Sequence, residues 1–199
     1  MTSETVPRSR SGFGQELDRI TLERARRGDT DACAAIYRRY ATACFNLALR
    51  ILGERAAAED VVQEVFLKMM NTISGFRGDA PFGVWLKRMT ANATIDALRA
   101  GQRFADEDPE TVFAAMASRG ADADQRVDAF SLLMRLPARA RAVLVLHELE
   151  GYTHKELSEL FGQSESYSKS ILARALKKLG GTGEPIQPEG ELATCASNL

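Results

Sequence analysis

Apolar residues recur every three to four positions through most of the chain, which is the period of an α-helix. The pattern is most regular over residues 31–52 and 56–73. Strict alternation of apolar and polar residues is absent, and no hairpin turn signal occurs, so the sequence predicts an all-α fold. The expected helices span residues 17–27, 31–52 and 56–73, a segment from the loop 74–82 to residue 99, and residues 127–136, 137–149, 153–161 and 165–179.

Breaks in this pattern divide the 199 residues into two small helical domains joined by a flexible acidic linker. The linker has weak periodicity and many acids, with a short helix conceivable at residues 109–116. The two ends lack core residues and are expected to be disordered. The predicted organisation is a disordered segment 1–17, a first domain 18–100, a linker 101–125, a second domain 126–180 and a disordered acidic tail 181–199.

The overall net charge of −1 conceals an uneven distribution. Residues 20–99 carry 12 basic and 9 acidic side chains, and residues 126–180 carry 9 and 6. The linker region 100–125 carries 2 basic and 6 acidic side chains, and residues 181–199 carry 3 acidic and no basic ones. Two mildly basic blocks separated by acidic segments favour a nucleic-acid partner, although only weakly.

Composition excludes several classes of function. No apolar run approaches the roughly 20 residues that span a bilayer, and no apolar segment follows the N-terminal arginines, so we expect a cytoplasmic protein without membrane insertion. Three cysteines and two histidines form no metal-ligand set, so no metal and no cofactor is expected. Cys33 and Cys44 lie among apolar helix residues and are predicted to be packed thiols, whereas Cys195 lies in the tail.

The second domain contains a helix-turn-helix pattern. Thr153 and Glu156 form a T-x-x-E capping box, Gly162 follows a short helix, and Ser164 can cap the next helix. The predicted inner face of that next helix comprises Ile171, Leu172, Ala175, Leu176 and Leu179, and its predicted outer face comprises Ser166, Tyr167, Ser170, Arg174, Lys177 and Lys178. Because no acid occurs between residues 166 and 178, we favour duplex DNA binding over a face kept polar for solubility.

The first domain carries two further polar surfaces. Opposite the apolar stripe of residues 56–73 lie Asp60, Gln63, Glu64, Leu67 and Asn71, a pattern that suits a protein partner. The helix after the loop 74–82 gathers Trp85, Arg88, Met89, Asn92, Asp96 and Arg99 on one side. Such a stripe suits single-stranded nucleic acid, through cations for phosphates and an aromatic surface for a base. Alternatively, Trp85 belongs to the core and the charged residues pair along the helix.

Three motifs together resemble bacterial RNA polymerase sigma factors of the extracytoplasmic-function group, over about residues 18–180. "AEDVVQEVFLKMM" resembles the core-binding helix of region 2, and "FRGDAPFGVWLKRMTANATIDALR" resembles its −10-reading and melting segment. "LPARARAVLVLHELEGYTHKELSELFGQSESYSKSILARALKKL" resembles region 4, which reads the −35 element. The resemblance implies an alternative sigma factor with no catalytic residues, whose linker threads through polymerase.

The resemblance also implies partners and site residues. The partners are the β and β′ subunits of core RNA polymerase, promoter DNA and an anti-sigma factor. The implied core-binding residues are Glu59, Asp60, Gln63, Glu64 and Leu67. The implied −10 residues are Arg77, Asp79, Trp85, Lys87, Arg88, Asn92 and Arg99, and the implied −35 residues are Ser166, Tyr167, Lys169, Ser170, Arg174 and Lys177.

The sequence departs from the family pattern at Ala57, often an aspartate, at Ile171, often an arginine, and at Asn71, commonly a large aromatic residue. Phosphorylation of a nearby hydroxyl side chain could supply the negative charge missing at position 57, but no Ser, Thr or Tyr lies between Arg50 and Asn71. We therefore expect core binding that needs no kinase, with Glu54 supplying that charge. The alternative function is a helix-turn-helix repressor or activator that binds duplex DNA without polymerase, with residues 18–100 as a sensor or dimerisation domain. A nucleic-acid enzyme would need clustered acids or a metal set, which the sequence lacks.

Overall fold

The computed structural model describes residues 12–101 and 129–180, and all regular elements within these ranges are helical. None of the helices described there is both long and apolar enough to cross a membrane. The N-terminal body consists of η1 (Gly12–Gly14), α1 (Arg19–Arg26), α2 (Thr30–Leu52), α3 (Arg55–Thr72), η2 (Ile73–Gly75) and α4 (Phe82–Gly101). The C-terminal body consists of α6 (Ala129–Met134), α7 (Ala138–Leu144), a π-helical turn η3 (Val145–Leu149), α8 (His154–Phe161) and α9 (Glu165–Gly180).

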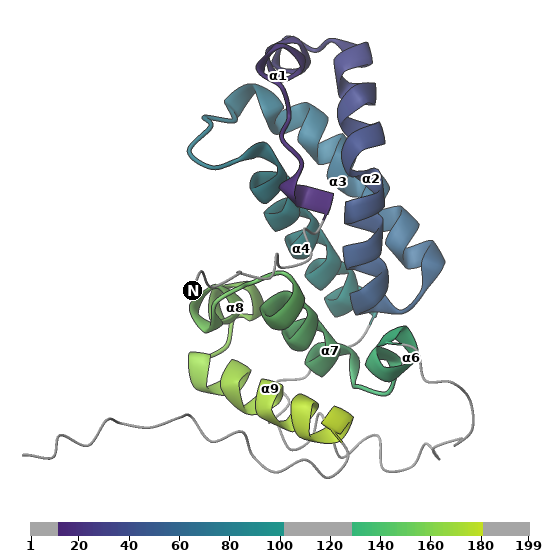
Figure 1. Ribbon diagram of the computed structural model, residues 1–199, viewed down its shortest axis with the longest axis vertical. Coiled ribbons are helices and arrows are strands. Elements are labelled where there is room, and N and C mark those ends of the chain that lie inside the picture. Colours follow the sequence, from purple (N-terminus) through teal and green to yellow (C-terminus); the bar gives the residue numbers. More distant parts are fainter. Residues whose placement is uncertain (1–11, 102–128, 181–199) are drawn as a thin grey trace, which may run out of the picture.

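Three long helices, α2, α3 and α4, pack side by side in the N-terminal body, with α1 across one end (Figure 1). Their apolar stripes meet in a core whose largest members are fully buried. This confirms the all-α class. The buried residues include Ile36, Tyr40, Leu47, Ile51, Met69, Leu86 and Ile95.

Local signals set the boundaries of these helices. Asp29 caps α2 by accepting hydrogen bonds from the backbone N–H groups of Asp31 and Ala32 at 2.9 and 3.0 Å. Gly53 ends α2 in the left-handed conformation, with φ at +78°, which favours glycine. Asp18 caps α1 in the same way as Asp29 caps α2.

The last part of the expected N-terminal disordered segment is instead packed. The Phe13 side chain is buried, and the Tyr40 hydroxyl donates to the Gln15 carbonyl at 2.6 Å. A Cβ placed on Gly83 of α4 would lie 1.9 Å from the Phe13 carbonyl oxygen, so the close approach requires glycine. The expectation of disorder is therefore wrong for residues 12–17, because one aromatic side chain anchors them.

The C-terminal body packs α9 against both α7 and α8 around Val143, Leu157 and Ile171, which are fully buried. The single helix expected over residues 137–149 is α-helical only to Leu144 and continues as the π-turn η3. The short helix conceived at 109–116 lies outside the described residues.

Two apolar side chains depart from their expected faces, because each apolar stripe is narrower than the sequence suggests. Met70 was expected in the apolar stripe of residues 56–73, and Leu176 on the inner face of the helix 165–179. They are 49% and 47% exposed, and each follows a buried neighbour by one residue, or about 100° of helical rotation. Cys33 and Cys44 are buried as expected, and burial raises the pKa of the Cys44 thiol to about 11. Cys195 lies outside the described residues.

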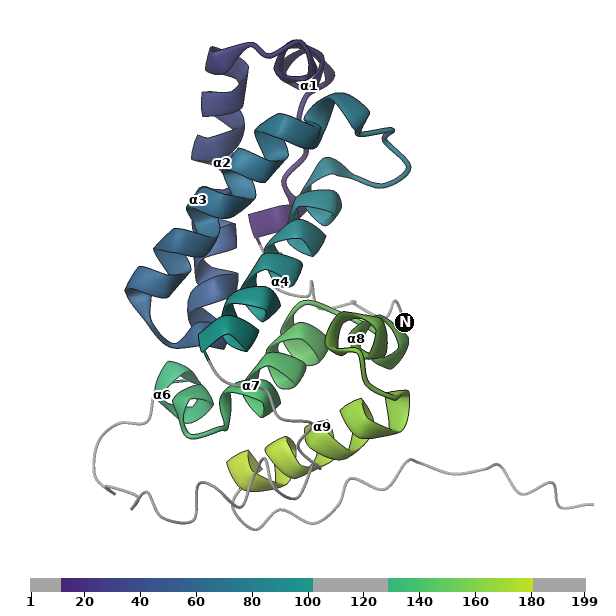
Figure 2. The same cartoon turned by 180° about the vertical axis from the view of Figure 1, so that it is seen from behind.

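The two bodies contact each other. The C-terminal body lies against one end of the N-terminal body in both views, with α7 on α2 and α8 on α4 (Figures 1 and 2).

Candidate nucleic-acid interface

The helix-turn-helix forms as the sequence predicts. The Thr153 N–H donates to the Glu156 carboxylate at 2.8 Å, and the Glu156 N–H donates to the Thr153 hydroxyl at 3.2 Å, which completes the capping box. Gly162 turns the chain with φ at +65°, and Ser164 accepts the Tyr167 N–H at 3.1 Å to start α9. The resulting geometry holds α9 as the outer helix of the pair.

The outer face of α9 is polar and mostly exposed. Lys169 pairs with Glu165 at 3.7 Å, one turn earlier on the same helix, and Arg174 is half-buried. Ile171, one of the positions at which the sequence departs from the pattern it resembles, is fully buried and belongs to the core. The exposed residues among those implied for the −35 element are Ser166, Lys169, Ser170 and Lys177.

Tyr167 does not lie on this outer face, so the expectation that it points outward is wrong. Its side chain is 9% exposed, and the Arg139 guanidinium donates to its hydroxyl at 2.8 Å. The physical reason is helical spacing, since Tyr167 precedes the buried Ile171 by four residues and therefore shares its face. The spacing of four residues between Tyr167 and Ile171 could have indicated from the sequence that Tyr167 is buried. Nothing close to Tyr167 in the sequence indicated that Arg139 is its hydrogen-bond partner.

At the start of α4, an aromatic cluster supports the loop 76–81. The Trp85 ring centroid lies 5.2 Å from that of Phe76 and 5.4 Å from that of Phe82, and Phe82 also packs 5.7 Å from Tyr40. Trp85 is half-buried in this cluster. The indole therefore belongs in part to the core, and its exposed part borders the polar stripe of α4.

The polar members of the α4 stripe have different environments. Arg88 is exposed and Asn92 is half-buried, whereas Met89 belongs to the core. Asp96 and Arg99 pair at 3.0 Å, as the alternative interpretation of the stripe expected. In the preceding loop, Arg77 and Asp79 form an exposed pair at 3.1 Å.

Two basic residues of α4 contact the C-terminal body. The Lys87 ammonium donates to the Glu150 backbone carbonyl at 2.6 Å and lies 3.7 Å from the Glu150 carboxylate. The Arg99 guanidinium donates to the Leu160 carbonyl at 2.7 Å. In this arrangement, both side chains are held by protein groups that the sequence analysis did not associate with them.

The outer face of α3 is exposed as expected. Leu67 is 62% exposed, and Asp60, Gln63 and Glu64 are also exposed. Glu59 pairs with Arg55 one turn earlier at 2.8 Å.

A groove between α2 and α3 adjoins this face. Tyr37, 48% exposed, stacks edge-on against Phe66 at 4.7 Å and lines the groove with Phe45 and Val62. The sequence analysis missed Tyr37 because a single apolar residue at the edge of a helical stripe looks like core. The groove and Leu67 together provide an apolar surface with an acidic rim, which suits a protein partner.

The described residues contain no group of three or more metal-ligating side chains. His147 and His154 stack with ring centroids 4.4 Å apart, and each is hydrogen-bonded within the C-terminal body, to the Tyr152 carbonyl and the Ser168 hydroxyl. These contacts give both histidines a structural role.

Comparisons with known proteins match both bodies. The family model for Sigma-70 region 2 matches residues 36–104, and the model for Sigma-70 region 4 matches residues 128–179. The ECF RNA polymerase sigma factor SigM of Mycobacterium tuberculosis is 30% identical over 171 residues, which cover 84% of this chain and 87% of SigM. The ECF RNA polymerase sigma-E factor of Escherichia coli is 26% identical over 186 residues, covering 86% of this chain and 97% of that protein.

Two solved complexes are also similar to the chain. CnrH in complex with the cytosolic domain of CnrY is 25% identical, covering 82% of this chain and 94% of that chain with a TM-score of 0.48. The sigma factor RpoE in complex with the anti-sigma factor NepR from Bartonella quintana is 18% identical, covering 73% of this chain and 92% of that chain with a TM-score of 0.49.

Proposed function

Since the chain belongs to the ECF RNA polymerase sigma factors, we propose a division of labour between its two bodies in promoter-specific transcription initiation. The protein is an alternative sigma factor that directs transcription. The observation that carries the division is the position of the two family matches, one on each body and each including an exposed polar helix face. This arrangement also disfavours the alternative of a repressor, because residues 36–104 match region 2 rather than a sensor or dimerisation domain.

Core RNA polymerase binds to the outer face of α3. Leu67 supplies the apolar contact, and Asp60, Gln63 and Glu64 surround it with acids and an amide that suit a basic partner surface. Ala57 leaves this face one carboxylate short, and Glu54, exposed at the start of α3 without a capping hydrogen bond, is positioned to replace that charge. Core binding therefore requires no phosphorylation.

The loop before α4 and the polar stripe of α4 read and open the −10 element. Arg88 and Asn92 contact the separated strand, one through phosphate and one through a base edge. Trp85 supports the loop that carries Arg77 and Asp79 and offers its exposed part to an unstacked base. We assign support of the loop to Trp85 because it is half-buried in the aromatic cluster, and contact with the strand to Arg88 because it is exposed.

The outer face of α9 reads the −35 element in the major groove. Ser166, Lys169 and Ser170 approach the DNA from the first turns of the helix, and Arg174 and Lys177 follow one to two turns later. Buried Tyr167 is not among the contacts. An anti-sigma factor, the remaining partner implied by the family, covers one of these surfaces in the cytoplasm.

In vitro transcription with purified core polymerase tests this function. The wild-type protein should restore initiation at specific promoters, which a repressor that binds only duplex DNA cannot do. Leu67→Arg should abolish both transcription and co-purification with core while leaving the circular dichroism spectrum unchanged. Ile20→Arg is the matched control, because Ile20 is an apolar side chain that is 74% exposed on α1 rather than on α3. Normal core binding by Leu67→Arg would contradict the assignment of α3.

A further inference from the structure

The loop that we assign to the −10 element has no core of its own. Residues 77–81 are all exposed, and they lie between two buried phenylalanines, Phe76 and Phe82. An exposed segment of this kind takes its position from the groups that hold its ends, because few buried contacts restrain its middle. The contacts at the two ends therefore decide where Arg77 and Asp79 lie.

The start of the loop is held by α1. The Arg26 guanidinium, in the last turn of α1, donates to the Ser74 carbonyl at 3.3 Å, and α1 packs against η2, to which Ser74 belongs. Arg26 also pairs with Glu23, one turn earlier in α1, at 3.6 Å. Since Ser74 lies two residues before Phe76, α1 contacts the backbone immediately before the exposed part of the loop.

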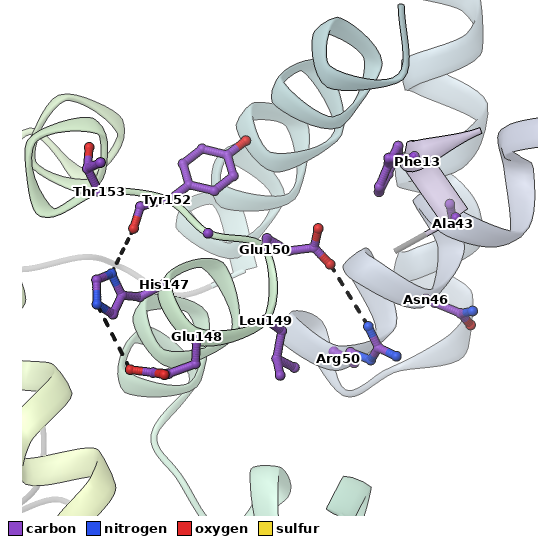
Figure 3. Close-up of a pocket in the computed structure, with 13 residues that line it drawn as sticks. Phe13, Ala43, Asn46, Arg50, His147, Glu148, Leu149, Glu150, Tyr152 and Thr153 are labelled. Atoms are coloured by element: carbon purple, nitrogen blue, oxygen red, sulfur yellow. Dashed lines mark hydrogen bonds and ion pairs between the residues drawn. The ribbon is translucent and has the colours of Figure 1, made fainter. Parts of the chain in front are cut away.

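The end of the loop is held by the segment before α1. The buried Phe13 brings its carbonyl against Gly83, the second residue of α4, where a Cβ would find no room. Figure 3 shows Phe13 beside Ala43 of α2, and a Cβ on Gly12 would lie 2.9 Å from the Ala43 Cβ. Both ribbon views place η1 beside the first turns of α4 (Figures 1 and 2). The chain at η1 is therefore packed between α2 and the start of α4.

Tyr40 of α2 connects this segment to the loop. Its hydroxyl donates to the Gln15 carbonyl at 2.6 Å, and the neighbouring Arg39 guanidinium donates to the Glu16 carbonyl. The Tyr40 ring centroid also lies 5.7 Å from that of Phe82, the buried residue at the end of the loop. One fully buried side chain thus contacts both the N-terminal segment and the loop.

We propose that residues 12–26, which we name the N-terminal clamp, fix both ends of the loop 76–81 and act as positioning residues for recognition of the −10 element. The proposal rests on the proposed function, since that function assigns the loop to DNA. The clamp precedes residues 36–104, the part of the chain that matches Sigma-70 region 2. Side chains that discriminate between bases must be held to within about 0.5 Å, so a loop fixed at both ends keeps a base preference that a loose loop loses.

Hydrogen exchange of the full-length free protein tests the clamp directly. The Phe76 N–H donates to the Ile73 carbonyl at 3.1 Å, and the Val84 N–H donates to the Pro81 carbonyl at 2.9 Å. One of these amides lies at each end of the loop. Their exchange rates therefore report how often each end opens.

Two variants loosen the two ends separately. Arg26→Ala should accelerate exchange of the Phe76 amide about fivefold, and Tyr40→Phe should do the same for the Val84 amide, the factor expected for one lost hydrogen bond. Tyr40→Phe keeps the ring and removes only the donor to the clamp. Arg27→Ala is the matched control, because it removes the same charge from the adjacent, exposed position and should leave both rates unchanged.

Transcription with core polymerase measures the effect on promoter reading. The template is a pool of DNA of random sequence upstream of a fixed reporter segment, and sequencing the templates that yield transcript gives the base preferences at −10 and −35 in one reaction. Arg26→Ala and Tyr40→Phe should lower the −10 preference about fivefold, the discrimination of one weak base contact. The −35 preference should stay unchanged, because the other body reads that element. A general loss of folded protein would instead reduce transcript and leave both preferences unchanged.

The outcomes separate this proposal from the proposed function. Unchanged exchange at Phe76 and Val84, or equal acceleration throughout the N-terminal body, would overturn the clamp. Faster exchange with an unchanged −10 preference, or an equal loss of −35 preference, would overturn its role in promoter reading. If Tyr40→Phe does not fold, Arg26→Ala makes the test from a side chain that is 35% exposed. The proposed function fails independently if the wild-type protein with core polymerase yields no promoter-specific transcript, a result that leaves the exchange measurement intact.

Discussion

Replacing Tyr167 by phenylalanine tests whether its hydroxyl stabilises the C-terminal body or contacts DNA. The Arg139 guanidinium donates to this hydroxyl at 2.8 Å, and both side chains are 9% exposed. Tyr167→Phe keeps the ring, which lies 5.7 Å from the Arg139 guanidinium carbon, and removes only the acceptor. Because a hydrogen bond to a charged group contributes about 1.5–3 kcal/mol, we expect the C-terminal body to lose about 2 kcal/mol of unfolding free energy. That loss corresponds to about a 30-fold change in the unfolding equilibrium constant.

Urea denaturation followed by two probes measures this change. Trp85 is the only tryptophan, so its fluorescence reports the N-terminal body, whereas far-ultraviolet circular dichroism reports the helices of both bodies. We expect the circular dichroism transition of Tyr167→Phe to begin about 1 M lower in urea, at an m-value near 2 kcal/mol/M. The tryptophan transition should move less.

Promoter preference provides the second half of this test. Tyr167→Phe should leave −35 preference unchanged under conditions in which the variant is folded. Lys169→Ala is the matched control on the exposed face, and it should alter DNA binding with little effect on stability, since an exposed i to i+4 ion pair contributes about 0.3–0.5 kcal/mol. A stability loss below about 0.5 kcal/mol, or a relaxed −35 preference in Tyr167→Phe, would refute burial of the ring as the basis of its role.

Three further predictions concern other parts of the molecule. Arg88→Ala should impair open-complex formation more on duplex than on pre-melted promoter DNA, and equal loss on both templates would argue against a melting role. Gly83→Ala should lower the melting temperature through a clash with the Phe13 carbonyl, at a cost of about 1–3 kcal/mol, and an unchanged melting temperature would show that residues 12–17 move aside freely. Hydrogen bonds from Thr153 lower the pKa of Glu156, so its stabilisation is present above the ordinary pKa and is lost as the pH falls through the lowered one. Glu156→Gln, which mimics the protonated acid, should therefore destabilise the protein at neutral pH and have little effect in strong acid, whereas a pH-independent difference in urea midpoint would contradict this linkage.

Much of the local structure could be predicted from the sequence, because local interactions create it. The stripe of residues 56–73 became α3, and the Thr153–Glu156 capping box starts α8 through bonds between residues three positions apart. The helix-turn-helix could be found for the same reason. Helical periodicity did not predict the burial of residues at the edge of an apolar stripe. Tyr167 of α9 is buried and Met70 of α3 is exposed, because the width of the buried arc depends on which helices pack against it.

The candidate site was predictable only in part. Exposure of Leu67 followed from helical position, since it lies opposite the apolar stripe of residues 56–73. The sequence did not indicate that Lys87 and Arg99, which share the α4 stripe, are held by backbone carbonyls of the C-terminal body. Nothing near either residue in the chain distinguishes it from Arg88.

The sequence by itself determined the two helical bodies, their caps and the chemistry of their outer faces, because each depends on residues within one or two turns of each other. Only the tertiary structure decided that Glu150 is a buried partner of Lys87, 63 positions earlier, and that Arg141 completes the end of α2 at Ile51, 90 positions earlier. A charged residue carries the same local pattern whether it faces water or a distant helix. Its partner is set by how the two bodies dock, and docking depends on the shapes and charges of whole surfaces that no short window of sequence contains.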